Sequence, residues 1–502
     1  MKQRALLTAV LFLLYAPSLL SQWIDIRTVP IIASNQSQFY PSLARGMGNL
    51  SVAFDDPFAD PFVNPAKAER LSTLTLFASP TRNSWSNEDG GPVSTAVGSS
   101  AYPGAAFSSF PFGGFIRKES LFGGALFAYQ GYNAERSRQS GVVPFGLRDA
   151  LAESPPSRHD IGNNTYLFGL FGVRFPESQV SVAASAAWAK YGAIDGVNLL
   201  YPGSNDIRQD GWTLEYKLGV VGELTERDRL EFIAGWARFK ATHDVTYSTA
   251  SMIGPPVNSP YRTEINKDET SQWLLHAGYR RSMSDAWKVG ATIAVNWKDH
   301  PKIPNYDLAN IPRDPGTSVA YNFGLGALWS NGKSSWGFEY VYEPITSNTW
   351  AEAGEDPARV PPLPPTFKTV ENFFDFSNHI FRIGHQSDTN VDWLNYRFGA
   401  QFHVYSYSLD QHNNIAGTSR SMETGWVETT LSGGLTARFS NIQLIYTLQL
   451  VLGNGLVGTA GGMTRADAGA LTNDFLVAPS GRLVVDDIAL VTQQLSFVFF
   501  VE

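Results

Sequence analysis

The feature that most constrains the fold is a period-two alternation of apolar and polar side chains, while helical periodicity is scarce. In residues 285–298, Trp287, Ile293 and Trp297 fall on one face of an extended chain and Lys288 on the other. Such runs last about 10 to 14 residues, whereas strands of soluble proteins average about five or six. A tilted strand that crosses a bilayer needs about 9 to 11 residues. The alternation therefore predicts strands long enough to cross a membrane.

The connections between the candidate strands alternate without exception between seven tight turns and eight long segments. This is the asymmetry of an outer-membrane barrel, which has short periplasmic turns and long outer loops. The candidate strands start near residues 71, 105, 121, 163, 178, 210, 228, 271, 285, 317, 333, 377, 390, 424, 440 and 487. We therefore predict an all-β fold, a transmembrane antiparallel β-barrel of 16 strands. The even count places both termini on the periplasmic side.

Soluble all-β folds are the alternative. A propeller shows a repeat of about 40–50 residues, and no motif recurs at a fixed period in this chain. A β-sandwich or a secreted all-β enzyme can share the alternation, but neither requires strands of this length or this rhythm of connections. A charge that faces lipid near the midplane costs about 2–4 kcal/mol. We therefore expect the Trp-rich faces to contact lipid and the Arg, Glu and His positions to face the lumen.

Composition excludes several functions. Charged residues are 17% of the chain, below the roughly 25% of a soluble domain. Because the chain has no cysteine, it has no disulfide, thiol nucleophile or zinc–cysteine site. The net charge of -8 argues against nucleic-acid binding, which needs a basic face. His159-Asp160 and His243-Asp244 fall in predicted loops and are interpreted as loop polar residues, so we expect no enzyme, no cofactor and no metal.

The first 21 residues are predicted to be an export signal. Lys2 and Arg4 form a basic start, Leu6 to Leu14 is apolar, and a cleavage site lies near Ala16 or just after Ser21. A membrane anchor is the less favoured alternative, because the apolar run is short for a bilayer. The exported chain is expected in the bacterial outer membrane. We divide the chain into residues 1–21 (signal peptide), 22–70 (an N-terminal element) and 71–502 (the barrel).

Residues 22–70 do not alternate and are rich in turn formers, such as Asp55-Asp56-Pro57 and Asn64-Pro65. A barrel of 14 or 16 strands is too wide for its own side chains to fill, so we expect this element to plug the lumen as a hatch. Asp55, Asp56 and Asp60 either cap turns or, as the less favoured alternative, bind calcium. Apolar surface that either contacts a ligand or packs the plug against the wall comes from Phe39, Tyr40, Phe54, Phe58 and Phe62.

Three stretches of this element carry a resemblance to a known family. Gly46-Met47-Gly48, Ala53-Phe54-Asp55-Asp56 and Asn64-Pro65-Ala66 resemble the outer-membrane long-chain fatty-acid transporter (FadL) family and its PorV-like relatives in secretion systems. The resemblance implies a monomeric barrel whose hatch occupies the lumen. In transporter members, a hydrophobic ligand caught by the outer loops reaches a pocket beside the hatch and leaves sideways through a gap in the wall.

The resemblance implies passive transport of hydrophobic small molecules, gated by the hatch. PorV-like members instead bind secreted or surface proteins. The Pro-rich stretch from Asp356 to Pro365 is interpreted as a stiff outer loop or as a docking strip for such a partner. A general porin needs an open lumen, which a bulky hatch argues against. The chain departs from the family in its count of 16 strands, where the family has 14, and in ending at Glu502 rather than at an aromatic residue.

Overall fold

The computed structural model describes residues 24, 26, 36, 37, 40–87, 92–95, 98–137, 158–194, 206–248, 261–299, 316–352, 364, 367–415, 417–460 and 481–501. The predicted signal peptide, Phe39 and all of the Pro-rich stretch except Pro364 lie outside the described residues.

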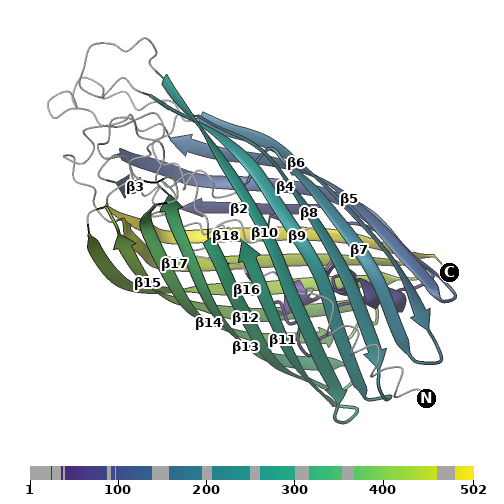
Figure 1. Cartoon of the computed structure of the whole chain (residues 1–502). Coiled ribbons are helices and arrows are strands. Elements are labelled where there is room, and N and C mark those ends of the chain that lie inside the picture. The colour runs from purple at the N-terminus through teal and green to yellow at the C-terminus, as the bar shows by residue number, and fades with distance from the viewer. Residues whose placement is uncertain are drawn as a thin grey trace.

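The described chain is almost entirely β-strand, with three short helical segments before the first strand (Figure 1). The helical segments are η1 Ala44–Met47, α2 Asp60–Val63 and η2 Pro65–Arg70. The strands are β1 Leu74–Ala78, β2 Thr81–Asn87, β3 Pro92–Thr95, β4 Gly98–Lys118, β5 Leu121–Ser137, β6 Arg158–Phe175, β7 Val180–Tyr191, β8 Asp206–Glu223, β9 Asp228–Ser248, β10 Tyr261–Ser282, β11 Trp287–Asp299, β12 Gly316–Ser330, β13 Ser334–Glu352, β14 Lys368–Asp388, β15 Leu394–Asn413, β16 Thr418–Phe439, β17 Ile442–Ala460 and β18 Gly481–Val501. None of the helical segments among the described residues is long and apolar enough to cross a membrane.

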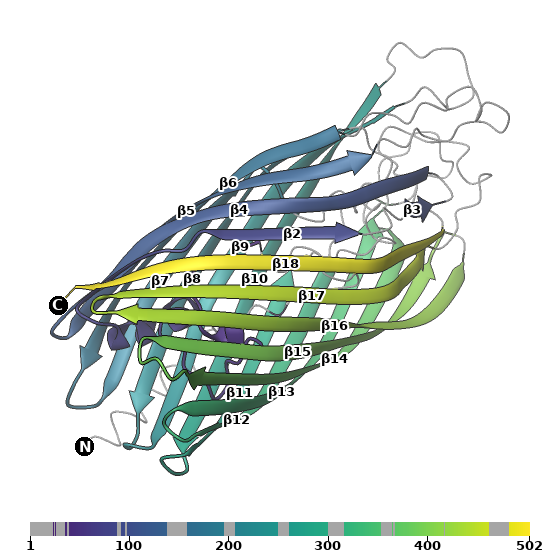
Figure 2. The ribbon, with the colours of Figure 1, turned by 180° about the vertical axis from the view of Figure 1, so that it is seen from behind.

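The sheet closes on itself into an antiparallel barrel, seen from two sides in Figures 1 and 2. At the closing seam, Leu74 of β1 lies opposite Val501 of β18 on one side and Ile116 of β4 on the other. β1, β2 and β3 follow one another along β4, so they form one interrupted strand. With β4 to β18, this gives a barrel of 16 strands. The predicted count is confirmed, and the family's 14 does not apply.

The break between β1 and β2 falls at Ser79-Pro80. Proline has no N–H to donate to a sheet ladder, so the regular pairing stops there. Neighbouring groups still bridge the gap: the N–H of Ser79 donates to the carbonyl of Pro111 (3.0 Å), and the N–H of Leu495 donates to the carbonyl of Pro80 (3.1 Å). The wall therefore stays continuous across an irregular first strand.

The seven tight turns that the sequence predicts contain two to five residues and lie at one end of the barrel, and we call them the short turns. The strict alternation with long connections was wrong in two places. Only two residues separate β3 from β4 and only four separate β15 from β16, because these strands extend into the segments predicted to be loops. Leu74 pairs with Ile116, near the Lys118 end of β4. The start of β1 and the end of β18 therefore lie at the end of the barrel that carries the short turns.

Most strands are longer than predicted: apart from the broken first strand, they contain from 12 residues in β7 to 22 in β10, and only β7 and β11 stay within the predicted length. The extra residues lie at the end of the long connections. His243-Asp244 belongs to β9 and His159-Asp160 to β6, so placing these pairs in loops was wrong. Beyond the hydrocarbon layer both faces of a strand meet water, so the alternation that marks a strand in the sequence fades there.

The exterior is apolar. In β11, Trp287 and Trp297 are 48% and 37% exposed, whereas Asn296 is buried. The two tryptophans stand ten residues apart on one strand, which corresponds to about 33 Å along the chain and about 25 Å in height at a tilt near 40°. That is the height of the apolar band of a membrane barrel, so the exposed Trp-bearing face of β11 has the dimensions expected of the predicted lipid-facing surface. Trp426 of β16 is an exception, because it is buried inside the lumen.

Candidate functional site: the hatch in the lumen

Residues 40–71 comprise the continuously described part of the predicted hatch (residues 22–70) and Leu71, and they fold into a compact element inside the barrel near the end with the short turns (Figure 2). η1 lies against β14 to β17, and η2 lies against β5 to β8. These two groups of strands are far apart in the order of the barrel wall. The element therefore spans the lumen, and we call residues 40–71 the hatch.

The Gly46-Met47-Gly48 motif ends η1 and places its backbone against the wall. Gly48 has a φ of +67°, a left-handed conformation that favours glycine, and its N–H donates to Oγ of Ser432 (2.9 Å) on β16. A Cβ added to Gly399 of β15 would lie 2.3 Å from the nitrogen of Gly48. The backbone of the motif can therefore lie directly against β15, because the residue that faces it there is a glycine.

The same close approach recurs on other strands. A Cβ on Gly384 of β14 would lie 2.4 Å from the carbonyl oxygen of Met47, and one on Gly219 of β8 would lie 2.1 Å from Oδ1 of Asn64. Glycines thus line the inner wall where the hatch rests on it.

We predict that Gly399→Ala separates the hatch from β15, because the added methyl group meets backbone that cannot move aside. Overpacking of this kind costs about 1–3 kcal/mol, so amide exchange over residues 44–50 should speed up by about tenfold or more, measured by hydrogen exchange and mass spectrometry. Gly433→Ala on β16 is the matched control, since a Cβ there has only the carbonyl oxygen of Arg397 nearby, at 3.9 Å. Equal acceleration in both variants would contradict this account of the wall glycines.

The Asn64-Pro65-Ala66 motif starts η2. Oδ1 of Asn64 accepts from the N–H of Ala66 (3.1 Å), and proline occupies the first helical position, where no N–H is needed. All three residues are buried. The motif therefore serves as a buried N-terminal cap of η2.

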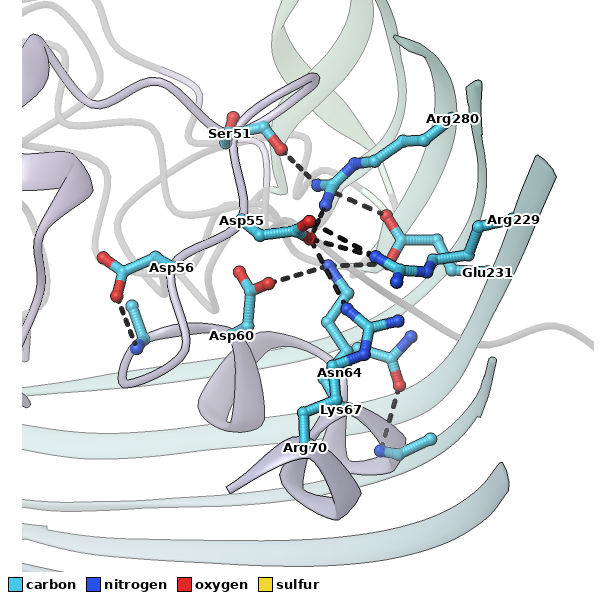
Figure 3. A network of polar contacts seen from close by, with 12 residues as sticks. Ser51, Asp55, Asp56, Asp60, Asn64, Lys67, Arg70, Arg229, Glu231 and Arg280 are labelled. Atoms are coloured by element: carbon cyan, nitrogen blue, oxygen red, sulfur yellow. Dashed lines mark hydrogen bonds and ion pairs between the residues drawn. The ribbon is translucent and has the colours of Figure 1, made fainter. Parts of the chain in front are cut away.

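Asp55 is the centre of an ionic network between the hatch and the wall (Figure 3). Its carboxylate contacts Arg280 of β10, Arg229 of β9 (3.2 Å) and Arg70 of the hatch (3.4 Å). Burial acts to raise the pKa of Asp55, but the charges of Arg280, Lys67, Arg229 and Arg70 outweigh it and hold that pKa well below its usual range. Asp55 is therefore a charged anchor that three arginines share.

Asp60 and Lys67 form a second link to the wall. Nζ of Lys67 lies 3.2 Å from Asp60 and 2.7 Å from Glu231 of β9. Burial raises the pKa of Asp60 to about 6, against the opposing charges of Lys67 and Arg280. Glu231 also lies 3.5 Å from His276 of β10. Glu231, a wall residue of the kind predicted to face the lumen, therefore pairs with a side chain of the hatch.

Asp56 serves the fold of the hatch itself. Its carboxylate accepts from Oγ of Ser42 (2.7 Å), the N–H of Ala44 (2.9 Å) and the N–H of Phe58 (3.2 Å). The turn-capping interpretation of the hatch aspartates therefore describes Asp56, whereas Asp55 and Asp60 pair with cationic side chains. Within the part of the chain that the structure describes, no group of three His, Cys, Asp or Glu residues is placed to hold a metal.

Glu339 of β13 contacts the hatch backbone, which the sequence did not predict. Its buried carboxylate accepts from three successive backbone N–H groups, those of Ser51 (2.8 Å), Val52 (2.5 Å) and Ala53 (3.1 Å). Arg280 donates to the carbonyls of Ser51 (2.7 Å) and Val52 (2.6 Å) from the other side. Glu339 and Arg280 of the wall thus hold the same stretch of hatch backbone. In the sequence, the inward-facing positions of these two residues on their strands were the only indication of this role.

The opposite side of the hatch is aromatic. The ring centroid of Phe62 lies 4.6 Å from that of Tyr40, 4.9 Å from that of Phe168 on β6 and 5.6 Å from that of Phe115 on β4. The described members of the predicted ligand-facing set are Tyr40, Phe54, Phe58 and Phe62, and the three phenylalanines are buried. These rings pack the hatch against the wall, which was one of the two interpretations, and contact with a ligand stays a prediction.

An apolar groove of about 760 Å³ lies on the outer face over β11 to β14. Exposed side chains such as Leu325 and Phe338 border it, and Gly290 and Gly326 are part of its lining. The hatch lies directly behind, since a Cβ on Gly290 would lie 2.6 Å from the carbonyl oxygen of Val52 and one on Gly326 would lie 3.0 Å from Cβ of Val52. Only the thickness of the backbone separates the groove from the hatch here.

No protein-family model matches the chain, and no curated protein matches it. Among solved structures it is similar to the CymD monoaromatic hydrocarbon channel, with 13% identity over 92% of this chain and 97% of that chain and a TM-score of 0.38. It is also similar to the Ralstonia pickettii toluene transporter TbuX, with 11% identity, coverage of 92% and 98% and a TM-score of 0.39. A Pseudomonas aeruginosa FadL homologue matches with 10% identity, coverage of 91% and 98% and a TM-score of 0.43. Likeness this distant carries no conclusion about a ligand or a partner.

Proposed function

We propose that this chain is a passive outer-membrane channel for hydrophobic small molecules, with the hatch as its gate. The observation that carries the proposal is the way the hatch is held across the lumen: ion pairs join it to β9 and β10, hydrogen bonds join it to β13, and aromatic rings contact β4 and β6. Aromatic rings that only pack against one another can separate around an apolar solute, while the ion pairs keep the hatch attached to the wall.

The resemblance at residues 46–66 supports the same proposal, since transporter members release their ligand sideways. In this chain the outer groove is the candidate exit, because Gly290 and Gly326 leave the wall thin and lipid-facing side chains surround it. We place the short turns and both termini in the periplasm, because outer-membrane barrels have short periplasmic turns. We treat the barrel as a monomer, as the resemblance implies.

Native mass spectrometry of the protein purified in a mild detergent tests the proposal. We expect retained acyl chains or detergent molecules, and we expect added dodecanoate to replace them. A lumen without any apolar molecule, together with a protein that co-purifies stably, would instead support a PorV-like barrel that binds secreted or surface proteins.

A further inference from the structure

A group of cationic side chains crosses the outer surface of the barrel on β7 to β10, four strands that lie side by side in Figure 1. Lys190 of β7 pairs with Trp212 of β8, and Trp212 pairs with Lys240 of β9. Lys240 in turn pairs with Glu269 of β10. These residues therefore form one row across four strands, and Arg238 stands two positions before Lys240 on the same face of β9.

The row faces away from the lumen. Ala189, next to Lys190, is buried in the core around the hatch, and Ala241, next to Lys240, is also buried. Successive residues of a strand face opposite sides of the sheet, so Lys190 and Lys240 point outward. Their side chains are 48% and 39% exposed.

An aromatic layer borders the row on the side of the short turns. Tyr216 of β8 pairs with Trp236 of β9, and Trp236 pairs with Trp273 of β10. The ring centroid of Trp236 lies 6.1 Å from that of Tyr216 and 6.2 Å from that of Trp273. Tryptophan and tyrosine gather where the hydrocarbon core of a membrane meets the headgroups. The aromatic layer therefore marks an edge of the apolar band.

The height of the row above the short turns agrees with this placement. Lys190 stands ten residues beyond Val180, the first residue of β7, and Lys240 stands twelve beyond Asp228, the first of β9. At a tilt near 40°, these lengths correspond to about 25–30 Å, and the apolar band of a barrel is about 25 Å tall. With the short turns in the periplasm, the row lies at the headgroups of the outer leaflet.

Cations outnumber anions here. Glu269 contacts Arg238 and lies 2.8 Å from Nζ of Lys240, so it holds these two cations side by side. Lys190 contacts Asp210 in the next row outward, and Thr242 pairs with both Asp210 and Lys267 in that row. Four cationic side chains thus accompany two anionic ones among the described residues of this surface. We call it the basic patch: Lys190, Arg238, Lys240 and Lys267.

The wall at β14 to β16 differs at a similar distance from the short turns. Asp375 of β14 pairs with Ser408 of β15, and Ser408 pairs with Glu423 of β16. Phe374 and Phe376 beside Asp375 are buried in the lumen, so Asp375 faces outward, and both acids are exposed. The positive charge therefore marks one sector of the outer surface.

We propose that the basic patch binds a phosphorylated, multiply acylated glycolipid of the outer leaflet, which is the chemistry of lipid A. The phosphates accept hydrogen bonds from Lys190 and Lys240, which flank Trp212, and from Arg238. The acyl chains lie along the aromatic layer. Basic residues beside an apolar surface are the recognised pattern for anionic lipid headgroups. This inference goes beyond the proposed function and rests on its placement of the short turns in the periplasm.

Native mass spectrometry of the full-length protein in detergent, titrated with bisphosphorylated lipid A, tests the proposal. We expect one bound molecule, held about tenfold or more tightly than dephosphorylated lipid A with the same acyl chains or than phosphatidylglycerol. Inorganic phosphate at the same concentration should not compete. Equal affinity for either comparison lipid, or competition by inorganic phosphate, would overturn the proposal.

A set of variants locates the contact. Lys190→Gln/Arg238→Gln/Lys240→Gln should weaken lipid A binding by about tenfold or more, whereas Lys190→Arg/Arg238→Lys/Lys240→Arg, which keeps the charges, should bind within about threefold of the wild type. The matched control is Arg227→Gln/Arg281→Gln/Lys333→Gln, which removes three exposed cations at the short turns and should change nothing. All variants should keep the heat-dependent gel mobility of a folded barrel.

The outcomes separate this inference from the channel proposal. Unchanged lipid A binding in the glutamine variant of the basic patch would overturn the inference, and so would an equal loss in the control variant. A loss in the control variant alone would move the lipid to the short turns and contradict their periplasmic placement as well. The glutamine variant should still bind dodecanoate as the wild type does, because the basic patch lies outside the lumen.

Discussion

Deleting residues 22–60 is expected to raise the single-channel conductance in planar bilayers by about tenfold or more. These residues include η1 and the segment up to Asp60, which lie across the lumen of a 16-stranded barrel. Barrels of 16 to 18 strands without a plug enclose an aqueous channel. The deletion removes Asp55 together with the backbone that Glu339 and Arg280 hold. Of the contacts described on the polar side of the lumen, the remaining residues keep the pair of Lys67 with Glu231.

The deletion is informative only if the barrel still folds. The shift in electrophoretic mobility on heating, which distinguishes folded from unfolded barrels, should be the same as in the wild type, because the strand pairing does not include residues 22–60. A folded deletion variant with the conductance of the wild type would falsify the gate assignment.

Replacing Arg280 by methionine is expected to loosen the hatch more than any other single change at the wall. Arg280 pairs with Asp55 and donates to the carbonyls of Ser51 and Val52, and its side chain is only 10% exposed. Breaking a buried ion pair on one side costs about 3–5 kcal/mol. In the variant, Asp55 still pairs with Arg229 and Arg70 and is partly exposed, so we expect a cost at the lower end of this range. We expect amide exchange over residues 50–56 to speed up by about 100-fold.

Arg281→Met is the matched control for Arg280→Met. Arg281 is the next residue along β10, but its side chain is 50% exposed and pairs with Asp228 at 3.3 Å near the turn. Exposed pairs contribute only about 0–1 kcal/mol, so the exchange of hatch amides should change by less than about fivefold. A loosening by Arg281→Met as large as that by Arg280→Met would show that the ionic network does not hold the hatch.

The barrel could be predicted from the sequence because each strand carries its own signal. The alternation of Trp287, Ile293 and Trp297 depends on which face meets lipid, a property of one strand alone. Tight turns such as Asn331-Gly332, where Gly332 has a φ of 89°, are equally local. The prediction failed where both faces of a strand leave the lipid, as at His243 in β9.

The contacts of the hatch could not be predicted, because they join residues that are hundreds of positions apart. The alternation assigns Arg280 and Glu339 to the lumen side, but it does not indicate that both meet Ser51 and Val52. That meeting depends on the curvature of the closed sheet and on the path of the hatch across it. The motif residues Gly48 and Asn64 were identified, yet their partners are glycines of the wall, which leave no pattern in the sequence.

The meeting of the two ends of the sheet has a consequence for how the protein assembles. The pairs that close the ring, such as Leu74 with Val501, join residues separated by almost the whole chain, and contacts of such long sequence separation form slowly. They also form against a first strand that is broken at Pro80. Since Leu71 leads from η2 almost directly into β1, the hatch has to be inside the curling sheet before the last hairpin arrives. Ring closure is therefore expected to be the late step, and it traps the N-terminal element instead of admitting it afterwards.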